Sequence, residues 1–188
     1  PMVADPLTPY DCSPISDGAA AILLVAADAA RNFAKPAVRV LGFGQASDSL
    51  ALFRRPDLTT LPAARQAAQR AYRMAGVGPS DITCCQIYDC YTYTVLVTLE
   101  DYGFCKKGEG GPFVEDWKLA PGGSLPTNTG GGELSAYYMW GMTPLSEGII
   151  QGRGHGGERQ VKNDVILVTG NGGNLSYHAC LILSPHPA

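Results

Sequence analysis

The sequence predicts an α/β domain in which helices and a sheet form separate layers. Its 188 residues are enough to bury a sizeable core. Hydrophobic residues make up 45% and charged residues 16%, a balance typical of a packed globule and not of a disordered chain. Strand-like and helix-like segments alternate along most of the chain, and two strand-like segments close it. This order is typical of helices layered on a sheet.

Local patterns predict the individual elements after a loop-like start. Apolar and β-branched runs predict strands at 18–26, 38–47, 82–88, 164–170 and 177–183. Helices are predicted at 27–33, 62–75 and 92–102, with helical segments broken near Pro144 at 133–152. The helix over 62–75 is the best defined, because Pro62 stands at its start and Gly76 at its end. Residues 103–132 are rich in Gly and Pro, and loops of this length tend to be functional.

Charge and hydropathy exclude several classes of protein. The net charge is -3, and the densest cationic spots are the pairs Arg54-Arg55 and Lys106-Lys107. We therefore expect no nucleic-acid partner. There is no apolar run long enough for a membrane span and no basic segment leading into one, so a cytoplasmic protein without a signal peptide is expected. The first residue is not Met, which suggests one piece of a larger protein.

The six cysteines favour free thiols over other roles. They are Cys12, Cys84, Cys85, Cys90, Cys105 and Cys180. An even count allows disulfides, but two of the six are adjacent and three lie in apolar, strand-like segments. No C-x-x-C pair occurs, so no metal site is expected. We expect buried free thiols in a reducing compartment.

Two glycine clusters are candidate parts of a site. Residues 170–174 (GNGGN) run from one predicted strand into the next, which fits either a plain hairpin turn or a tight turn beside a ligand. Residues 128–132 (NTGGG) precede a helical segment. Two interpretations are open. The backbone N–H groups of these residues bind an anion or oxyanion, or the segment is only the loop that leads into the helix. The three histidines have no partner at a telling spacing, so no catalytic histidine is predicted.

Tyrosines surround the two most irregular regions. The five concerned are Tyr88, Tyr91, Tyr93, Tyr137 and Tyr138. Most tyrosines serve packing through an apolar ring and a polar tip. A phenol starts from a pKa near about 10, so it needs help from its surroundings to act as an acid or a base.

Several motifs in order carry a family resemblance. Residues 11–25 (DCSPISDGAAAILLV) resemble N-A-S-x-x-N-D-G-A-A-A, and residues 128–141 align with N-x-x-G-G-x-x-x-x-G-H-P-x-G. Residues 170–173 align with a closing C-x-G-G, and residues 104–111 (FCKKGEGG) fit the same series. The chain thus resembles the C-terminal half of the thiolase superfamily. It is most similar to the sterol-carrier-protein-linked thiolases, their lipid-transfer-like relatives and the steroid side-chain aldolases.

The resemblance implies a layered α-β-α half of the thiolase fold with a mixed five-stranded sheet. Residues 17–188 would be the thiolase C-terminal domain, and residues 1–16 the tail of the preceding loop region. An N-terminal half of the fold, a homodimer and, as in the aldolases, a small OB-fold partner protein are implied as well.

The departures from the family pattern fall on its functional positions. Tyr88 stands where a thiolase has an Asn or His, Tyr138 where it has the His of G-H-P, and Gly170 where it has the acid/base Cys. Claisen condensation needs a thiolate, a histidine that activates it and a second base. Gly170 offers no base and Tyr138 no ion pair, so thiolytic cleavage is not expected.

Two tyrosines facing one pocket suit a retro-aldol cleavage of a β-hydroxyacyl-CoA, with a bulky steroid-like acyl chain as one candidate substrate. The aldolases that the chain resembles have tyrosines at the positions of Tyr88 and Tyr138, which are therefore the expected catalytic pair. The expected substrate-binding positions are Asn128, Trp140, Gly172 and Gly173. No cofactor is expected beyond the coenzyme A of the substrate.

Two further functions remain open. A thiolase fold without its His and Cys suits a non-catalytic protein that binds or transfers acyl-CoA or lipid. An atypical acetyl-CoA acyltransferase that keeps a nucleophilic Cys in its N-terminal half is the other.

Overall fold

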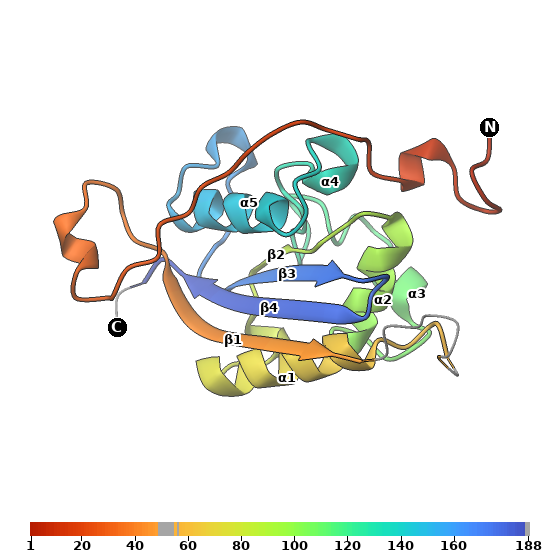
Figure 1. Cartoon of the computed structure of the whole chain (residues 1–188), viewed down its shortest axis with the longest axis horizontal. Helices are drawn as coiled ribbons and strands as arrows, with labels where there is room; N and C mark the ends of the chain where they lie inside the picture. The colour runs from red at the N-terminus through yellow and green to blue at the C-terminus, as the bar shows by residue number, and fades with distance from the viewer. Residues whose placement is uncertain (49–54, 56, 187–188) are drawn as a thin grey trace.

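The computed structural model describes residues 1–48, 55 and 57–186 as a layered α/β structure. The strands are β1 (Arg39–Ser47), β2 (Cys84–Gln86), β3 (Ile166–Gly172) and β4 (Tyr177–Ser184). The α-helices are α1 (Pro62–Ala75), α2 (Thr92–Asp101), α3 (Gly110–Val114), α4 (Gly132–Ser135) and α5 (Met142–Gly152). Helix α1 covers one face of the sheet, and α5 lies with α4 on the other (Figure 1). No helix in the described part of the chain is long and apolar enough to cross a membrane.

The sheet is mixed, with the strand order β1-β4-β3-β2. β4 runs antiparallel to both β1 and β3, whereas β2 pairs in parallel with β3. Cys85 lies opposite Leu167, which lies opposite Ile182, so buried side chains line up across the sheet. Since β2 and β3 are parallel, their carboxyl ends meet at one edge of the sheet. The segments that leave these two ends are therefore neighbours.

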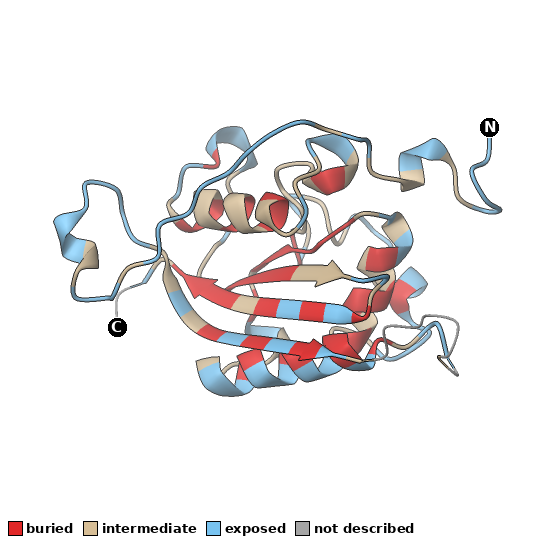
Figure 2. Cartoon of the chain, viewed as in Figure 1, coloured by how far each residue is buried: buried red, intermediate tan, exposed pale blue. Residues whose placement is uncertain are grey.

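Helix α1 approaches β1 unusually closely because both elements present small residues. The buried face of α1 consists mainly of alanines, namely Ala63, Ala64, Ala67, Ala68 and Ala71. A Cβ atom added to Gly44 of β1 would overlap the carbonyl oxygen of Ala67, and one added to Gly42 would overlap that of Ala71. The backbone of the helix thus packs directly on the strand. The main apolar core forms around this contact, where buried residues from α1 and the sheet face each other (Figure 2).

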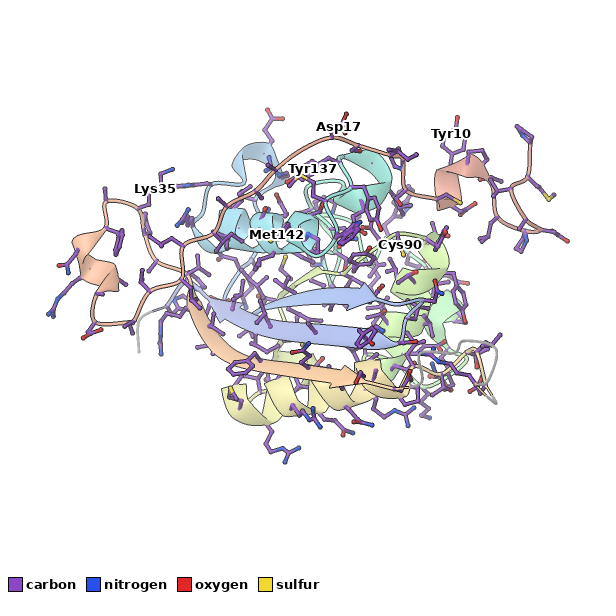
Figure 3. All side chains as sticks on the ribbon, in the orientation of Figure 1. Tyr10, Asp17, Lys35, Cys90, Tyr137 and Met142 are labelled. Atoms are coloured by element: carbon purple, nitrogen blue, oxygen red, sulfur yellow. The ribbon has the colours of Figure 1, made fainter. Side chains whose placement is uncertain are left out.

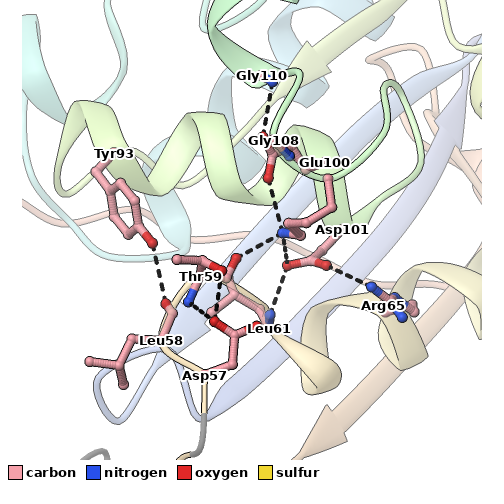
Figure 4. Close-up of polar contacts among 11 residues, drawn as sticks. Asp57, Leu58, Thr59, Leu61, Arg65, Tyr93, Glu100, Asp101, Gly108 and Gly110 are labelled. Atoms are coloured by element: carbon pink, nitrogen blue, oxygen red, sulfur yellow. Dashed lines mark hydrogen bonds and ion pairs between the residues drawn. The ribbon is translucent and has the colours of Figure 1, made fainter.

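A buried carboxylate joins α1, α2 and the loop that follows α2 (Figure 4). The Asp101 side chain is fully buried at the end of α2. Its oxygens accept hydrogen bonds from the Leu61 backbone N–H at 2.7 Å and the Lys107 ammonium at 2.9 Å, and form an ion pair with Arg65 at 3.2 Å. Lys107 also pairs with Glu100 at 3.0 Å. Lys107, one member of the cationic pair Lys106-Lys107, is therefore held in internal contacts.

Most of the predicted elements are confirmed. The strands over 38–47, 164–170 and 177–183 and the helices over 62–75 and 92–102 are present with small shifts at their ends. The strand over 82–88 is present but shorter. All six cysteines are free, and Cys84, Cys85 and Cys180 are buried as expected, whereas the other three are only partly buried.

The predicted strand over 18–26 is wrong, and so is the expected five-stranded sheet. The described residues form a sheet of four strands, and 18–26 is an extended segment without secondary structure. It crosses the outer side of α4 and α5, where nearly all of it is exposed (Figures 1 and 2). Leu23 and Leu24 are 71% and 82% exposed. An apolar run becomes a strand only where a neighbouring strand pairs with its backbone, and none lies beside this one in the described chain.

Two helical predictions are also corrected. Residues 27–33 contain only a turn and a short 3-10 helix, Ala30–Asn32. The break in 133–152 falls between α4 and α5, not at Pro144, which lies in the first turn of α5. Proline is tolerated there because the N–H groups of the first turn have no intrahelical acceptor. The long loop 103–132 also contains the short helix α3.

Gly44→Ala should lower the free energy of unfolding by about 1–3 kcal/mol, because the added methyl group meets the helix backbone and cannot turn away. Urea denaturation of the protein measures the change. Gly111→Ala is the matched control, since a Cβ atom there meets nothing within 4 Å. Equal stability of the two variants would contradict the close packing of α1 on β1.

Candidate active site

The site lies where β2 and β3 end. Tyr88 follows β2 by two residues and is only 5% exposed. Its backbone N–H donates a hydrogen bond of 3.0 Å to the Thr169 hydroxyl of β3. The segment after β2 is therefore fixed to the neighbouring strand, and Tyr88 has a defined position.

Tyr138 reaches the same place from the loop between α4 and α5. Its hydroxyl oxygen lies 2.7 Å from that of Tyr88, and the two rings meet edge to face with centroids 6.2 Å apart. The loop is braced by the Thr143 hydroxyl, which accepts from the Met139 N–H at 2.9 Å and donates to the Tyr137 carbonyl at 3.0 Å. Tyr137 and Met142, labelled in Figure 3, mark the two ends of this braced loop.

Both phenols hold their protons firmly. Burial and the hydrogen bond to Tyr138 raise the pKa of Tyr88 well above its usual range, and Glu133 raises it further when it is ionised. Burial also raises the pKa of Tyr138, and its hydrogen bond with Tyr88 opposes part of that rise. Two protonated phenols that share one hydrogen bond can exchange a proton, but neither is a ready base by itself.

Asn128 joins the glycine-rich loop to the end of β2. Its Oδ1 accepts from the Ile87 backbone N–H at 2.7 Å, and its Nδ2 donates to the Ile87 carbonyl at 2.9 Å. Its own N–H donates to the Cys85 carbonyl at 2.9 Å. Asn128 has a φ of 52°, a left-handed conformation that asparagine adopts more readily than most residues. The side chain predicted to bind substrate therefore contacts the backbone that carries Tyr88.

The loop 128–132 opens α4, and a carboxylate occupies its N-terminus. Asp89 Oδ1 accepts from the Glu133 N–H at 2.7 Å. A Cβ atom on Gly132, whose φ is 62°, would overlap the Asp89 carboxylate. The sequence left two interpretations open for this loop, an anion site and a plain helix start. In the structure the loop starts α4, and the anion at that start is the protein's own Asp89 carboxylate.

Glu133 is a site residue that the sequence did not single out. It is fully buried, and neither carboxylate oxygen has a hydrogen-bond partner among the described residues. Burial, followed by the nearby charge of Asp89, raises the pKa of Glu133 to about 8. The only sequence signal was an acidic residue directly after a glycine cluster, a pattern typical of an ordinary helix start.

A polar network supports the far side of the loop, next to a pocket of about 190 Å³. Gln86 donates to the Thr129 hydroxyl at 3.0 Å, which in turn donates to Glu147 at 2.8 Å. Glu147 also accepts from Gln151 at 2.9 Å and Arg159 at 3.1 Å. Because these groups satisfy one another, the network holds the loop in place.

The other predicted positions lie at different distances from the tyrosine pair. Gly170 packs against Gly141 of the Tyr138 loop, since a Cβ atom on either glycine would come within 4 Å of the other's Cα. Gly172 ends β3 and Gly173 begins the turn into β4, so a hairpin turn is present, but it lies at 173–176 and residues 170–172 belong to β3. Trp140 is 70% exposed on the surface of the loop. The structure thus brings together the three positions at which the sequence departs from thiolases.

No group of three His, Cys, Asp or Glu side chains in the described part of the chain is placed to hold a metal ion.

The fold and this site match a known family. Residues 44–185 match the model described as Thiolase C-terminal domain-like, and the chain belongs to this family. The predicted thiolase resemblance is therefore confirmed.

The chain is similar to proteins of more than one activity. It is 40% identical over 184 residues to an acetyl-CoA acetyltransferase of Methanothermobacter thermautotrophicus, covering 94% of this chain and 48% of that protein. It is 35% identical over 156 residues to a steroid side-chain-cleaving aldolase of Thermomonospora curvata, covering 81% and 40%. A solved Ltp2-ChsH2(DUF35) aldolase superposes with a TM-score of 0.88 and 31% identity, covering 98% of this chain and 49% of that one. The chain spans about half the length, or less, of these relatives.

Asn128→Ala should lower the free energy of unfolding by about 2–4 kcal/mol, because it leaves both backbone groups of Ile87 unpaired and puts alanine at positive φ. Asn174→Ala is the control for the backbone term, since Asn174 is an exposed turn residue with a φ of 53°. It should cost only about 1 kcal/mol. Equal losses in urea denaturation would show that the Asn128 amide does not hold the loop.

Proposed function

We propose that the chain is the C-terminal half of a thiolase-fold lyase that cleaves a β-hydroxyacyl-CoA by a retro-aldol reaction. The observation that carries the proposal is the 2.7 Å contact between the Tyr88 and Tyr138 hydroxyls, with Gly170 beside the loop of Tyr138. A thiolase has its acid/base groups at these three positions. Here two phenols and a glycine without a side chain replace them.

The reaction needs one proton removed and one proton delivered. The β-hydroxyl loses its proton as the bond between the α- and β-carbons breaks, and a ketone or aldehyde forms. The electron pair of that bond becomes an enolate on the thioester carbonyl. Protonation of the α-carbon then gives the shortened acyl-CoA, so no net proton is taken up or released.

A hydrogen-bonded phenol pair suits this balance. One tyrosine accepts the hydroxyl proton while its own proton crosses to the other tyrosine, which delivers a proton to the α-carbon. No free tyrosinate has to form, so the raised pKa values of both phenols do not stop the reaction. A thiolate mechanism finds no second base here, because Gly170 has no side chain.

The rest of the enzyme follows from the same proposal. We expect an N-terminal half of the thiolase fold to cover the apolar segment 18–26, and the intact protein to form a homodimer. We also expect a small OB-fold partner that helps to hold the acyl-CoA. The two-component aldolase among the similar structures supports a partner protein. Asn128 would position the loop of the site, while Trp140, Gly172 and Gly173 would line the approach of the substrate.

The test is cleavage of β-hydroxyacyl-CoAs, including steroid-derived ones, by the intact protein together with its OB-fold partner. Product masses should show a shortened acyl-CoA and a ketone or aldehyde. Tyr138→Phe and Tyr88→Phe should each lower kcat by roughly 10²–10⁴-fold, the usual loss for a general acid or base. Tyr137→Phe is the matched control, because this adjacent tyrosine lies outside the pair, and it should leave kcat within a few fold.

Other outcomes point to the two alternatives. Acyl-CoA binding without cleavage of a carbon–carbon bond would identify a carrier and contradict the lyase proposal. Products of thiolysis or condensation with free coenzyme A would identify an acyltransferase, as the similarity to an acetyl-CoA acetyltransferase allows. That result would require a nucleophilic Cys in the N-terminal half.

A further inference from the structure

Two buried acidic residues in contact at the site, Asp89 and Glu133, have very different surroundings. Asp89 is 3% exposed, and its Oδ1 accepts a hydrogen bond from the Glu133 backbone N–H at 2.7 Å. Burial raises the pKa of Asp89, but the nearby donors on the Glu133 and Leu134 backbone and the Asn128 side chain oppose that rise. Glu133 is 0% exposed, and both its oxygens lack a partner among the described residues. A carboxylate with several donors tolerates its charge, whereas one without donors in an apolar setting keeps its proton. Asp89 is thus the anion of the pair and Glu133 the neutral acid.

Glu133 lies near enough to the proposed catalytic pair to influence the pKa of both phenols. When Glu133 is ionised, its charge raises the pKa of Tyr88 and Cys90, which follow β2, and of Tyr138, which comes from the loop after α4. Asp89 is the fourth ionisable group that faces it. No hydrogen bond joins Glu133 to either phenol in the described structure, and its oxygens are closed off from solvent. Its influence on the phenols is therefore electrostatic, through a poorly solvated interior.

We propose that Glu133 is a positioning residue that must stay uncharged for Tyr88 and Tyr138 to pass a proton. Its ionisation therefore lowers the activity at alkaline pH. The inference rests on the proposed retro-aldol function. Negative charge develops on the phenol oxygens and the enolate during that reaction. A second negative charge buried beside them opposes this development, and a neutral acid does not.

The first test compares pH profiles of kcat/KM for the intact enzyme and Glu133→Gln, which keeps the shape of the side chain and removes its ionisation. The pKa of Glu133 is about 8, so wild-type activity should fall about tenfold per pH unit above that value. The variant should retain its activity, and at pH 9 it should exceed the wild type by about tenfold. At pH 6.5 the two enzymes should agree within a few fold.

Two results in this test would overturn the proposal. An alkaline limb that survives unchanged in the variant belongs to another group, such as the partly buried thiol of Cys90. An equal loss of activity at every pH marks Glu133 as a structural residue only. Glu158→Gln is the matched control, because Glu158 is exposed in the short 3-10 helix Gly157–Arg159 that follows α5, and its profile should follow the wild type.

The second test does not depend on turnover. Infrared difference spectra between wild type and Glu133→Gln should show a protonated carboxylic acid at pH 6.5 that disappears as the pH passes through about 8. If Glu133 is already ionised at pH 6.5, for example through a cation from the other half of the fold, the inference fails whether or not the enzyme cleaves its substrates. If the wild type cleaves none of them, the lyase proposal fails and the spectra alone decide the state of Glu133. Glu133→Met replaces the glutamine variant if that variant does not fold.

Discussion

The Asn128 side chain connects two segments that lie 41 residues apart in the chain. Its amide pairs with both backbone groups of Ile87, the residue immediately before Tyr88. From Asn128 the chain runs through three glycines into α4, and the next loop carries Tyr138. The distance between the two phenols is therefore set by one amide and by the tight turn that follows it. The Thr169 hydroxyl then holds the Tyr88 segment, and the Thr143 hydroxyl holds the loop that carries Tyr138.

The sequence predicts the fold well where local chemistry decides the structure. Helix α1 follows from its alanines, from Pro62 in its first turn and from Gly76, whose φ of 70° ends it. Strands β3 and β4 follow from mainly apolar runs on either side of a glycine-rich segment. The segment 18–26 has an equally strong apolar run and forms no strand, because the pattern of a strand does not name its partner. The number of strands in the sheet was therefore beyond reach of local reasoning.

The site was predicted in a different way. Tyr88 and Tyr138 were identified through the family motifs that they interrupt, and their spacing of 50 residues carries no physical signal of contact. The pairing of the Asn128 amide with the Ile87 backbone was not predicted, because an asparagine before glycines is typical of a turn. Glu133 was missed for a similar reason: acidic residues in the first turn of a helix are usually solvated. Its burial belongs to the folded structure, in which its backbone contacts Asp89, a residue 44 positions earlier in the chain.

The exposed segment 18–26 also affects how a purified polypeptide of these 188 residues would behave in solution. Its backbone has no ladder partner in the described chain, and its side chains are almost all apolar. A strand-length, uncharged, apolar segment with unpaired N–H and C=O groups is a template for pairing with other chains. A protein made of these 188 residues alone would carry that template on its surface and associate through it at high concentration. A purification would therefore have to keep this segment covered before any property of the tyrosine site is measured.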